Sequence, residues 1–443
     1  MAGFVVDVKE VMLVTPESPT PKHILKLSSL DSQLFLRFTI EYLFIYPPHP
    51  NQDRGTVVEQ MKAGLARALV PYYPFSGRVR QRSDGLGLEV VCHAQGAVFI
   101  EAESNASVCE FERAPRRRNQ WRKLLAIHVE DVLAGPALIV QLTWLADGAA
   151  ALAVGISHCI CDGIGSGEFL NSWAELATGQ RGLDELQPEP VWDRHLLEPM
   201  QAPHNLIPHP EFERVQDQCR FSTRLTKEPL VPTAICFDRR HLVELKKLAS
   251  ASEDEWVDSV GIPSRVSDFP YTSFEVLSAH VWRCWVRAME LPERQTVRLL
   301  FSIDIRRRVE PGLPEGYYGN GFVLGCAQAT VKELDENGLG WAAGLVRSAK
   351  ERVGDEYVRS VVEMVSESRA SPDLVGVLIL SQWSRLGLER VDFGLGKPLH
   401  VGPICCDIYC LFLPVYKQRD AVKVMLAVPK SGISKYEYWL RNP

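Results

Sequence analysis

One stretch of the sequence, residues 149–176, constrains the fold more than any other. Residues 149–157 form an apolar run that predicts a buried strand. The hexapeptide His158-Cys-Ile-Cys-Asp-Gly163 follows it. The apolar residues that then recur at helical spacing are Phe169, Leu170, Trp173 and Leu176. A buried strand that leads through a tight turn into an amphipathic helix is typical of an α/β protein.

The turn after this strand carries a candidate catalytic base. A histidine at the end of a buried strand can accept a proton near neutral pH without a metal or a cofactor. The spacing His158-x-x-x-Asp162 is a weak signal by itself, because His49 and Asp53 repeat it. Three prolines surround His49 and exclude the interior of a strand or helix, so we interpret the second match as a loop coincidence.

Composition places the chain among ordinary globular proteins. Its 443 residues are enough for two or three domains, and 46% of them are hydrophobic and 23% charged. The net charge of −6 argues against a general nucleic-acid binder. We interpret the basic run at 113–123 as a solvated surface segment, with attraction of an anionic ligand or partner as the alternative.

We expect neither a targeting segment nor a membrane segment. Residues 1–10 include Asp7, Lys9 and Glu10, where a signal peptide would be apolar. No apolar run is long enough to cross a bilayer. The eleven cysteines are scattered, so we expect reduced thiols and a cytoplasmic protein. Cysteines near the histidine turn and near residue 405 lack metal-ligand spacing, so we expect no metal site.

A proline-rich stretch divides the sequence into two halves. We predict an N-terminal domain at 1–181, a crossover linker at 182–232 and a C-terminal domain at 233–443. The acidic stretch 253–259 is expected to be a surface loop. Apolar patterns predict a helix at 56–69 and strands at 38–46, 86–92, 138–144, 297–305 and 422–428.

The clearest helix signal of the second half lies at 271–291. Thr272 and Glu275 form a capping-box pattern at its start. The apolar stripe that follows consists of Phe274, Leu277, Val281 and Trp285. The plain interpretation is a well-capped core helix. The alternative is functional, because the free amide groups at a helix N-terminus can bind phosphate.

Three further motifs accompany the His158 turn. They are Val70-Pro-Tyr-Tyr-Pro-Phe-Ser-Gly-Arg78, Asp304-Ile-Arg-Arg-Arg308 with its continuation to Asn320, and Asp392-Phe-Gly-Leu-Gly-Lys-Pro398. In this order and approximate spacing, the four motifs resemble those of the plant BAHD acyltransferases. The resemblance covers nearly the whole chain, and four motifs in order are specific where a single one would not be.

The resemblance implies a fold and a set of partners. The fold is α/β, with two chloramphenicol-acetyltransferase-like domains whose mixed β-sheets carry flanking helices, and with an active-site channel at the domain interface. An acyl-CoA co-substrate enters from one face and a small-molecule alcohol acceptor from the other. No permanently bound cofactor, nucleic acid or membrane span is expected, and the family tendency is to be monomeric.

The chemistry assigns roles to the residues of the turn. A thioester is already an activated acyl donor, so the missing element is a base for the attacking hydroxyl, and His158 is our candidate. The resemblance implies that Asp162 points away from the base and pairs with an arginine, for which Arg306 is the candidate. Gly163 is expected to give the turn its backbone freedom.

The C-terminal motif departs from the family pattern at one position. The family has tryptophan where this chain has Leu395, and a leucine side chain cannot donate a hydrogen bond to the tetrahedral oxyanion. Either another donor, such as a backbone amide, takes this role, or the tryptophan chiefly packs. We assign Asp392 to the catalytic site with His158, and expect it to hold the loop of Gly394, Leu395 and Gly396 near the channel.

Four residues are expected to contact coenzyme A: Thr272, Ser273, Arg306 and Lys397. The predicted function is transfer of a hydroxycinnamoyl or longer aliphatic acyl group from a CoA thioester to a hydroxyl of a small plant metabolite, in specialised or surface-polymer metabolism. Two alternatives stay open. One is acylation of an amine, and the other is a non-catalytic partner of fatty-acid elongation, to which the altered Leu395 points.

Overall fold

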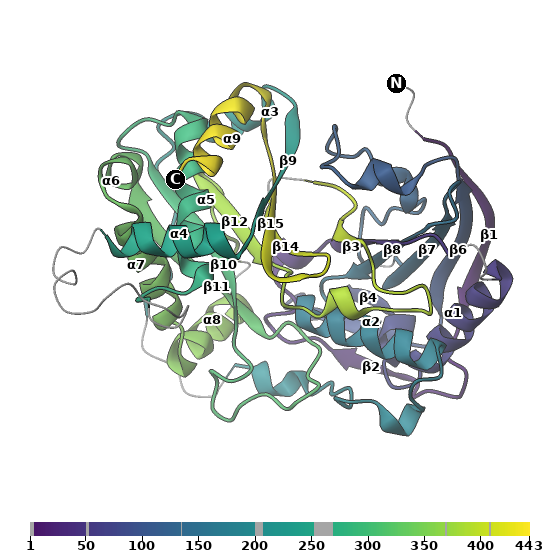
Figure 1. The fold of residues 1–443 in the computed structure, drawn as a ribbon. Coiled ribbons are helices and arrows are strands. Elements are labelled where there is room, and N and C mark those ends of the chain that lie inside the picture. The colour runs from purple at the N-terminus through teal and green to yellow at the C-terminus, as the bar shows by residue number, and fades with distance from the viewer. Residues whose placement is uncertain are drawn as a thin grey trace.

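Two mixed β-sheets organise the molecule, one in each of two halves that lie side by side in the computed structural model (Figure 1). The structure describes residues 4–49, 53–133, 135–199, 207–251, 269–367, 370–406 and 409–443. Each of these two sheets has six strands, and helices pack against it. The α/β class and the pair of mixed sheets are therefore confirmed.

The first sheet combines strands of the N-terminal half with one strand from far along the chain. Its strands are β1 (Val6–Val14), β3 (Thr39–Tyr46), β6 (Ala97–Ser104), β7 (Leu138–Trp144), β8 (Ala150–Ser157) and β13 (His400–Pro403). Their order is β1-β6-β7-β8-β3-β13, and β6 and β7 run parallel. A separate antiparallel sheet consists of β2 (His23–Lys26), β5 (Leu88–Cys92) and β4 (Arg78–Gln81).

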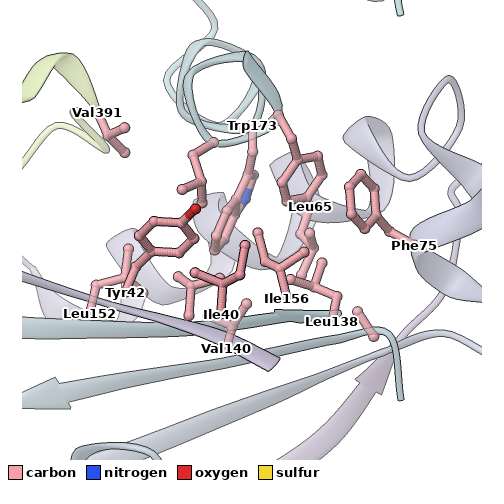
Figure 2. Packing of buried hydrophobic residues seen from close by; sticks show 14 of the residues in the cluster. Ile40, Tyr42, Leu65, Phe75, Leu138, Val140, Leu152, Ile156, Trp173 and Val391 are labelled. Carbon is pink, nitrogen blue, oxygen red and sulfur yellow. The ribbon is translucent and has the colours of Figure 1, made fainter. Parts of the chain in front are cut away.

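Both faces of the first sheet are covered, which explains its continuous apolar runs. Two helices pack on one face, α1 (Arg54–Ala68) and α2 (Gly163–Ala177). Figure 2 shows Tyr42 and Ile156 rising from the sheet toward Trp173 of α2. On the other face, Trp121 packs against Leu43 in a second apolar cluster. All eight residues of β8 are consequently buried, as expected for a strand covered on both sides.

The second sheet lies in the C-terminal half and is also mixed. Its strands are β9 (Leu230–Phe237), β10 (Thr296–Asp304), β11 (Phe322–Thr330), β12 (Val377–Gln382), β14 (Tyr409–Val415) and β15 (Gln418–Pro429). Their order is β11-β10-β12-β14-β15-β9, and β12 runs parallel to both β10 and β14. The helices of this half are α3 (Phe221–Thr226), α4 (Arg239–Ser250), α5 (Ser273–Met289), α6 (Val331–Glu336), α7 (Leu339–Glu351), α8 (Asp355–Glu367) and α9 (Ile433–Arg441).

The predicted helix at 271–291 is α5, and its capping box is present. Thr272 Oγ1 accepts from the N–H of Glu275 at 3.3 Å, and the Glu275 carboxylate accepts from the N–H of Thr272 at 2.7 Å. The other predicted strands and the helix at 56–69 are also present, as β3, β5, β7, β10, β15 and α1. The acidic stretch 253–259 lies outside the described residues. Within the described ranges, no helix is long and apolar enough to span a bilayer.

One face of the second sheet packs against the first half of the molecule. Leu300 and Leu324 on this face share an apolar cluster with Leu36 of the first half. Farther along the same face, Leu411 belongs to the main core of the first half. Alternate strand residues such as Phe412 face the helices instead. The two halves therefore bury apolar surface against each other along this face.

The chain returns to the first half after β12, which differs from the predicted domain boundaries. β13 pairs antiparallel with β3, so residues 400–403 complete the first sheet. Before it, the chain runs along α2, where Asn171 donates to the carbonyl of Gly387 at 3.2 Å (Figure 1). The predicted boundary assigns every residue after 232 to the second half, because pairing between distant strands leaves no local signal.

The predicted linker at 182–232 has local structure of its own. It contains short 3-10 turns at Leu183–Glu185 and Arg194–Leu197, and it contains α3. β9 begins at Leu230, before the predicted end of the linker. The crossover therefore belongs partly to the second sheet. Its turn at Arg194–Leu197 reaches the segment after β8, where Arg194 donates to the carbonyl of Ile160 at 2.7 Å.

Candidate active site

His158 lies at the junction of the two halves, directly after β8. Its backbone N–H donates to the carbonyl of Phe38 at 3.0 Å, next to the β3–β8 pairing. The imidazole makes an edge contact with the ring of Phe38, with centroids 5.1 Å apart. It lies 6.0 Å from the ring of Phe322 in the second half. The candidate base therefore sits where the halves meet.

The surroundings of His158 favour a neutral imidazole. Burial lowers its pKa from the ordinary value of 6.5, because an imidazolium would lose hydration among these rings. The carboxylates of Asp162 and Asp31 favour the charged form and offset part of this effect. The Nδ1 atom is buried and has no hydrogen-bond partner among the described residues. A neutral imidazole can accept a proton, so this environment suits a general base.

Asp162 is engaged by groups other than the imidazole. Its Oδ1 caps α2 by accepting from the N–H of Gly165 at 2.9 Å. Arg306 donates to both carboxylate oxygens at 3.0 Å, and the N–H of Gly321 adds a further contact at 3.0 Å. The structure brings Arg306 to Asp162 in a bidentate pair, which holds the turn that begins at His158.

Arg306 ties this turn to the second half of the molecule. Its Nη2 also donates to the carbonyls of Tyr317 and Gly319, each at 3.0 Å. Burial opposes its charge, but Asp162 and Asp304 outweigh burial and raise the pKa of Arg306. The guanidinium is thus held on all sides by protein groups. Its second predicted role, as a contact to coenzyme A, is not supported by this position.

Gly163 does not use the backbone freedom of glycine, which corrects its predicted role. It begins α2 without a left-handed φ, and a Cβ there would approach Leu386 Cδ1 at 2.8 Å. Two later glycines of α2 lie closer still to neighbouring backbone. At Gly165 a Cβ would lie 2.1 Å from the carbonyl oxygen of Tyr318, and at Gly167 a Cβ would lie 2.2 Å from the carbonyl oxygen of Leu386. The sequence carries a signal for this close packing, because three alternate glycines occur in one helix, where glycine is unfavourable.

Asp392 belongs to a turn that packs against the far part of α2. Its Oδ1 accepts from the N–H of Gly394 at 2.9 Å, and Gly394 and Gly396 have left-handed φ angles of 82° and 76°. The ring of Phe393 contacts Trp173, with centroids 4.5 Å apart. That contact lies about 15 Å along α2 from its N-terminus. The structure does not bring Asp392 to the imidazole, and its carboxylate holds the loop instead.

Leu395 and His49 show how this loop is held. The Leu395 side chain is 1% exposed and packs in the core of the first half. Its backbone carbonyl accepts a hydrogen bond of 2.7 Å from Nε2 of His49. Asp53 caps α1 by accepting from the N–H of Thr56. The second His-x-x-x-Asp match thus lies in a loop, as predicted, but its histidine anchors the Gly394–Gly396 turn.

A basic cavity of about 290 Å³ lies at the N-terminus of α5. Ser273 lines it and is next to the capping residue Thr272. Lys397, by contrast, is exposed on the loop that packs against α2 and is not among the lining residues. The charged side chains that line the cavity are Arg239, Lys246, Arg385, Arg419 and Asp420.

The cations of this cavity come together only through the order of the second sheet. Arg239 begins α4, Arg385 follows β12 and Arg419 lies in β15. β12 and β15 flank β14, so segments that are distant in sequence meet at one end of α5. The capping box predicts the helix N-terminus from sequence, but nothing local predicts the basic residues around it.

Comparisons with known proteins agree with this architecture. The family model described as the Transferase family matches residues 4–442. The chain is 35% identical to an omega-hydroxypalmitate O-feruloyl transferase of Arabidopsis thaliana, over 97% of this chain and 91% of the relative. It is 32% identical to a fatty alcohol:caffeoyl-CoA acyltransferase of the same plant, over 98% and 97%. The crystal structure of vinorine synthase shares the fold, with a TM-score of 0.73 and 20% identity over 97% of this chain and 96% of that chain.

The two mixed-sheet halves, with a half-buried histidine at their junction, define a two-domain acyltransferase. The chain belongs to the Transferase family, the BAHD acyltransferases that its motifs resemble. The enzyme class predicted from the sequence, transfer of acyl groups other than aminoacyl groups, is thereby confirmed.

Proposed function

We propose that the protein transfers an acyl group from a CoA thioester to the hydroxyl of an apolar alcohol, with His158 as the general base. The observation that carries the proposal is the position of the His158 imidazole between Phe38 of one half and Phe322 of the other, where burial lowers its pKa. Asp162 is occupied by Arg306, so the imidazole acts without a carboxylate partner.

The reaction follows from these groups. The imidazole takes the hydroxyl proton as the alcohol oxygen attacks the thioester carbonyl. The tetrahedral intermediate collapses by breaking the carbon–sulfur bond, and the imidazolium returns the proton to the leaving thiolate. The products are an ester and free coenzyme A, and the base is regenerated. Leu395 cannot donate to the oxyanion, so a donor from elsewhere at the junction takes that role.

The basic cavity at α5 is the proposed site for the phosphates of coenzyme A. Its four cations and the helix N-terminus provide the charge that a nucleotide with several phosphates needs. Ser273 adds a hydroxyl at the same helix end. Phe412 lines this cavity in β14, and Tyr409 begins the same strand about 10 Å away. Tyr409 points to the opposite face of the sheet from Phe412 and stacks there on Phe38, which touches the base. The strand β14 therefore has the cavity on one face and, near its start, the surroundings of His158 on the other.

The groups around the base favour apolar substrates. Phe38 and Tyr409 stack with centroids 6.4 Å apart and are each 38% exposed. Phe322 and Leu36 belong to an adjoining apolar cluster. Such surfaces favour aromatic acyl groups and aliphatic or aromatic alcohols over polar acceptors. The feruloyl and fatty-alcohol relatives support a hydroxycinnamoyl donor and a long-chain alcohol. The scattered cysteines agree with a cytoplasmic enzyme, which we propose to be monomeric.

The same geometry favours one of the alternatives. An amine acceptor favours free carboxylates near the base, but Asp162 is paired with Arg306 and Asp31 with Arg194. A non-catalytic partner would not need a neutral imidazole at the junction of the halves. We therefore favour acylation of a hydroxyl, and release of the CoA thiol by the purified protein distinguishes an enzyme from a non-catalytic partner.

The test is thiol release from feruloyl-CoA in the presence of hexadecan-1-ol, with ester formation followed by mass spectrometry. His158→Ala is expected to lower kcat at least about 100-fold, because general-base catalysis typically contributes 10²–10⁴-fold. The matched control is His49→Gln, which removes the histidine of the other His-x-x-x-Asp match and keeps a donor for the loop. It is expected to stay within about threefold of the wild type. Retention of most activity by His158→Ala would overturn the proposal.

A further inference from the structure

A second buried ion pair lies beside His158 and has no part in the mechanism above. Asp31, in the connection between β2 and β3, is 0% exposed, and Arg194, in the crossover, is 3% exposed. Asp31 Oδ2 and Arg194 Nε are 2.9 Å apart. A buried pair of this kind is weak evidence for stability, because desolvation of both charges offsets their attraction. Its position next to the base calls for another explanation.

Asn320 connects this ion pair to the base. Its side chain is 0% exposed, and its Nδ2 donates to Asp31 Oδ1 and to the backbone carbonyl of His158, each at 2.7 Å. Its backbone N–H also donates to Asp31 Oδ1, at 2.9 Å. Both hydrogens of the amide therefore have acceptors, and one of these is the carbonyl of the base itself. The charge on Asp31 strengthens the hydrogen bonds that hold the amide.

Arg194 holds the same turn two residues farther on. Its Nη2 donates to the carbonyl of Ile160 and its Nη1 to that of Trp192, each at 2.7 Å. The guanidinium lies over the ring of Trp192, 4.0 Å from its centroid. A Cβ at Gly319 would come within 2.4 Å of Arg194 Cζ, so this glycine makes room for the arginine. The guanidinium is thus closely confined at the turn.

His158 is consequently held through both of its peptide groups. Phe38 accepts from its N–H, and Asn320 donates to its carbonyl. These contacts come from both halves of the molecule. The ion pair that holds Asn320 also includes Arg194, which lies in the crossover. A general base must lie within hydrogen-bond reach of the proton that it removes. A displacement of about 1 Å at a reacting group can lower the rate about 100-fold.

We infer that Asp31, Arg194 and Asn320 form a positioning network that places the imidazole of His158 for proton transfer. This inference rests on the proposed role of His158 as the base. The network joins the first half, the crossover and the second half, so the base reaches its working position only when these three segments are assembled. None of the three side chains is assigned a contact with the substrate, and each acts through the backbone of the turn.

The first test compares two buried amides. Asn320→Ala removes the donor to the His158 carbonyl. Gln295→Ala removes an equally buried amide that donates to the backbone carbonyls of Gln216 and Thr296, directly before β10 and at the end of this strand remote from the base. We expect both variants to lower Tm. Asn320→Ala is expected to lower kcat about 100-fold with KM for both substrates within twofold, and Gln295→Ala to leave kcat unchanged.

The second test exchanges the two side chains in the double variant Asp31→Asn/Asn320→Asp. The exchange conserves charge and volume and lets residue 31 donate to residue 320, but residue 320 has no hydrogen for the His158 carbonyl. We expect Tm to be closer to that of the wild type than in Asn320→Ala, while kcat stays low. Recovery of kcat together with Tm would show a structural role alone and would overturn the inference. This exchange also decides the matter if Asn320→Ala does not fold.

His158→Ala in the same series separates this inference from the proposed function. An inactive His158→Ala together with a fully active Asn320→Ala would leave the base in place and reject the network. An active His158→Ala would reject the base, and the network with it. An inactive His158→Ala, with the loss in kcat expected for Asn320→Ala and for the exchange, supports both.

Discussion

Arg306 meets Asp162 across 144 residues of sequence, with two hydrogen bonds of 3.0 Å to the two carboxylate oxygens. The aspartate also caps α2 at Gly165, and the arginine also binds the carbonyls of Tyr317 and Gly319. The pair therefore links the turn after β8 to the second half. Its position explains why an aspartate four residues from His158 makes its hydrogen bonds to other groups and not to the imidazole.

Loss of the Arg306 side chain is expected to lower the free energy of unfolding. Arg306→Met leaves a buried, unpaired carboxylate at Asp162, which typically destabilises a protein by about 3–5 kcal/mol. The free energy of unfolding in urea measures this change. The double variant Asp162→Asn/Arg306→Met removes both charges and should recover most of the loss. An equally unstable double variant would contradict an unpaired charge as the cause.

The pH dependence of activity should reflect the lowered pKa of His158. Only the neutral imidazole can accept a proton, so kcat/KM rises as pH increases through the pKa of the free enzyme and then levels off. Because burial lowers this pKa, the midpoint of the acid limb is expected below pH 6.5. Burial also raises the pKa of Glu168 to about 7. Glu168→Gln should therefore leave the acid limb in place, and its disappearance in that variant would assign the limb to the glutamate.

The glycines of α2 should differ in their tolerance of a methyl group. At Gly165 a Cβ would meet the backbone oxygen of Tyr318, which cannot move away easily, so Gly165→Ala should destabilise the protein by about 3 kcal/mol. At Gly163 the obstacle is the end of the flexible Leu386 side chain, and alanine gains about 1 kcal/mol of helix propensity. We expect Gly163→Ala to be nearly neutral in denaturant unfolding. The reverse order would show that the turn needs glycine at 163 for its conformation.

Restoring tryptophan at position 395 should not improve catalysis. Leu395 is buried in the core of the first half, on the loop that packs against the far part of α2. A larger side chain there is expected to cost about 1–3 kcal/mol through overpacking. Leu395→Trp and Leu395→Phe should behave alike, with reduced Tm and no gain in kcat. A tenfold rise in kcat for the tryptophan variant alone would show that its indole N–H reaches the oxyanion.

The basic cavity should recognise the nucleotide part of the donor. Arg385→Ala removes one charged contact, worth about 1.5–3 kcal/mol, so KM for feruloyl-CoA should rise about tenfold or more. KM for feruloyl-pantetheine, which lacks the nucleotide and its phosphates, should not change. Lys397→Ala is the matched control and should alter neither value. An equal effect of Arg385→Ala on both donors would place the phosphates elsewhere.

Local patterns predict much of the fold, because their physical causes act over a few residues. The apolar run at 149–157 predicts β8, and the capping box of Thr272 and Glu275 predicts the start of α5. Both depend on side-chain periodicity and on backbone groups three or four residues away. The position of His158 at the end of a buried strand follows from the same reasoning.

The local patterns of the sequence therefore predict the α/β class, the division into two halves and the position of His158 at the end of its strand. The resemblance to a family adds the two mixed sheets and the arginine that meets Asp162. Three further features appear only in the folded molecule: β13 returns to the first sheet, Asp392 lies away from His158, and Asp31 and Arg194 meet beside His158. The physical reason is the distance over which each cause acts. Periodicity and capping act within one element, whereas these contacts depend on how strands and helices from distant parts of the chain are ordered and packed.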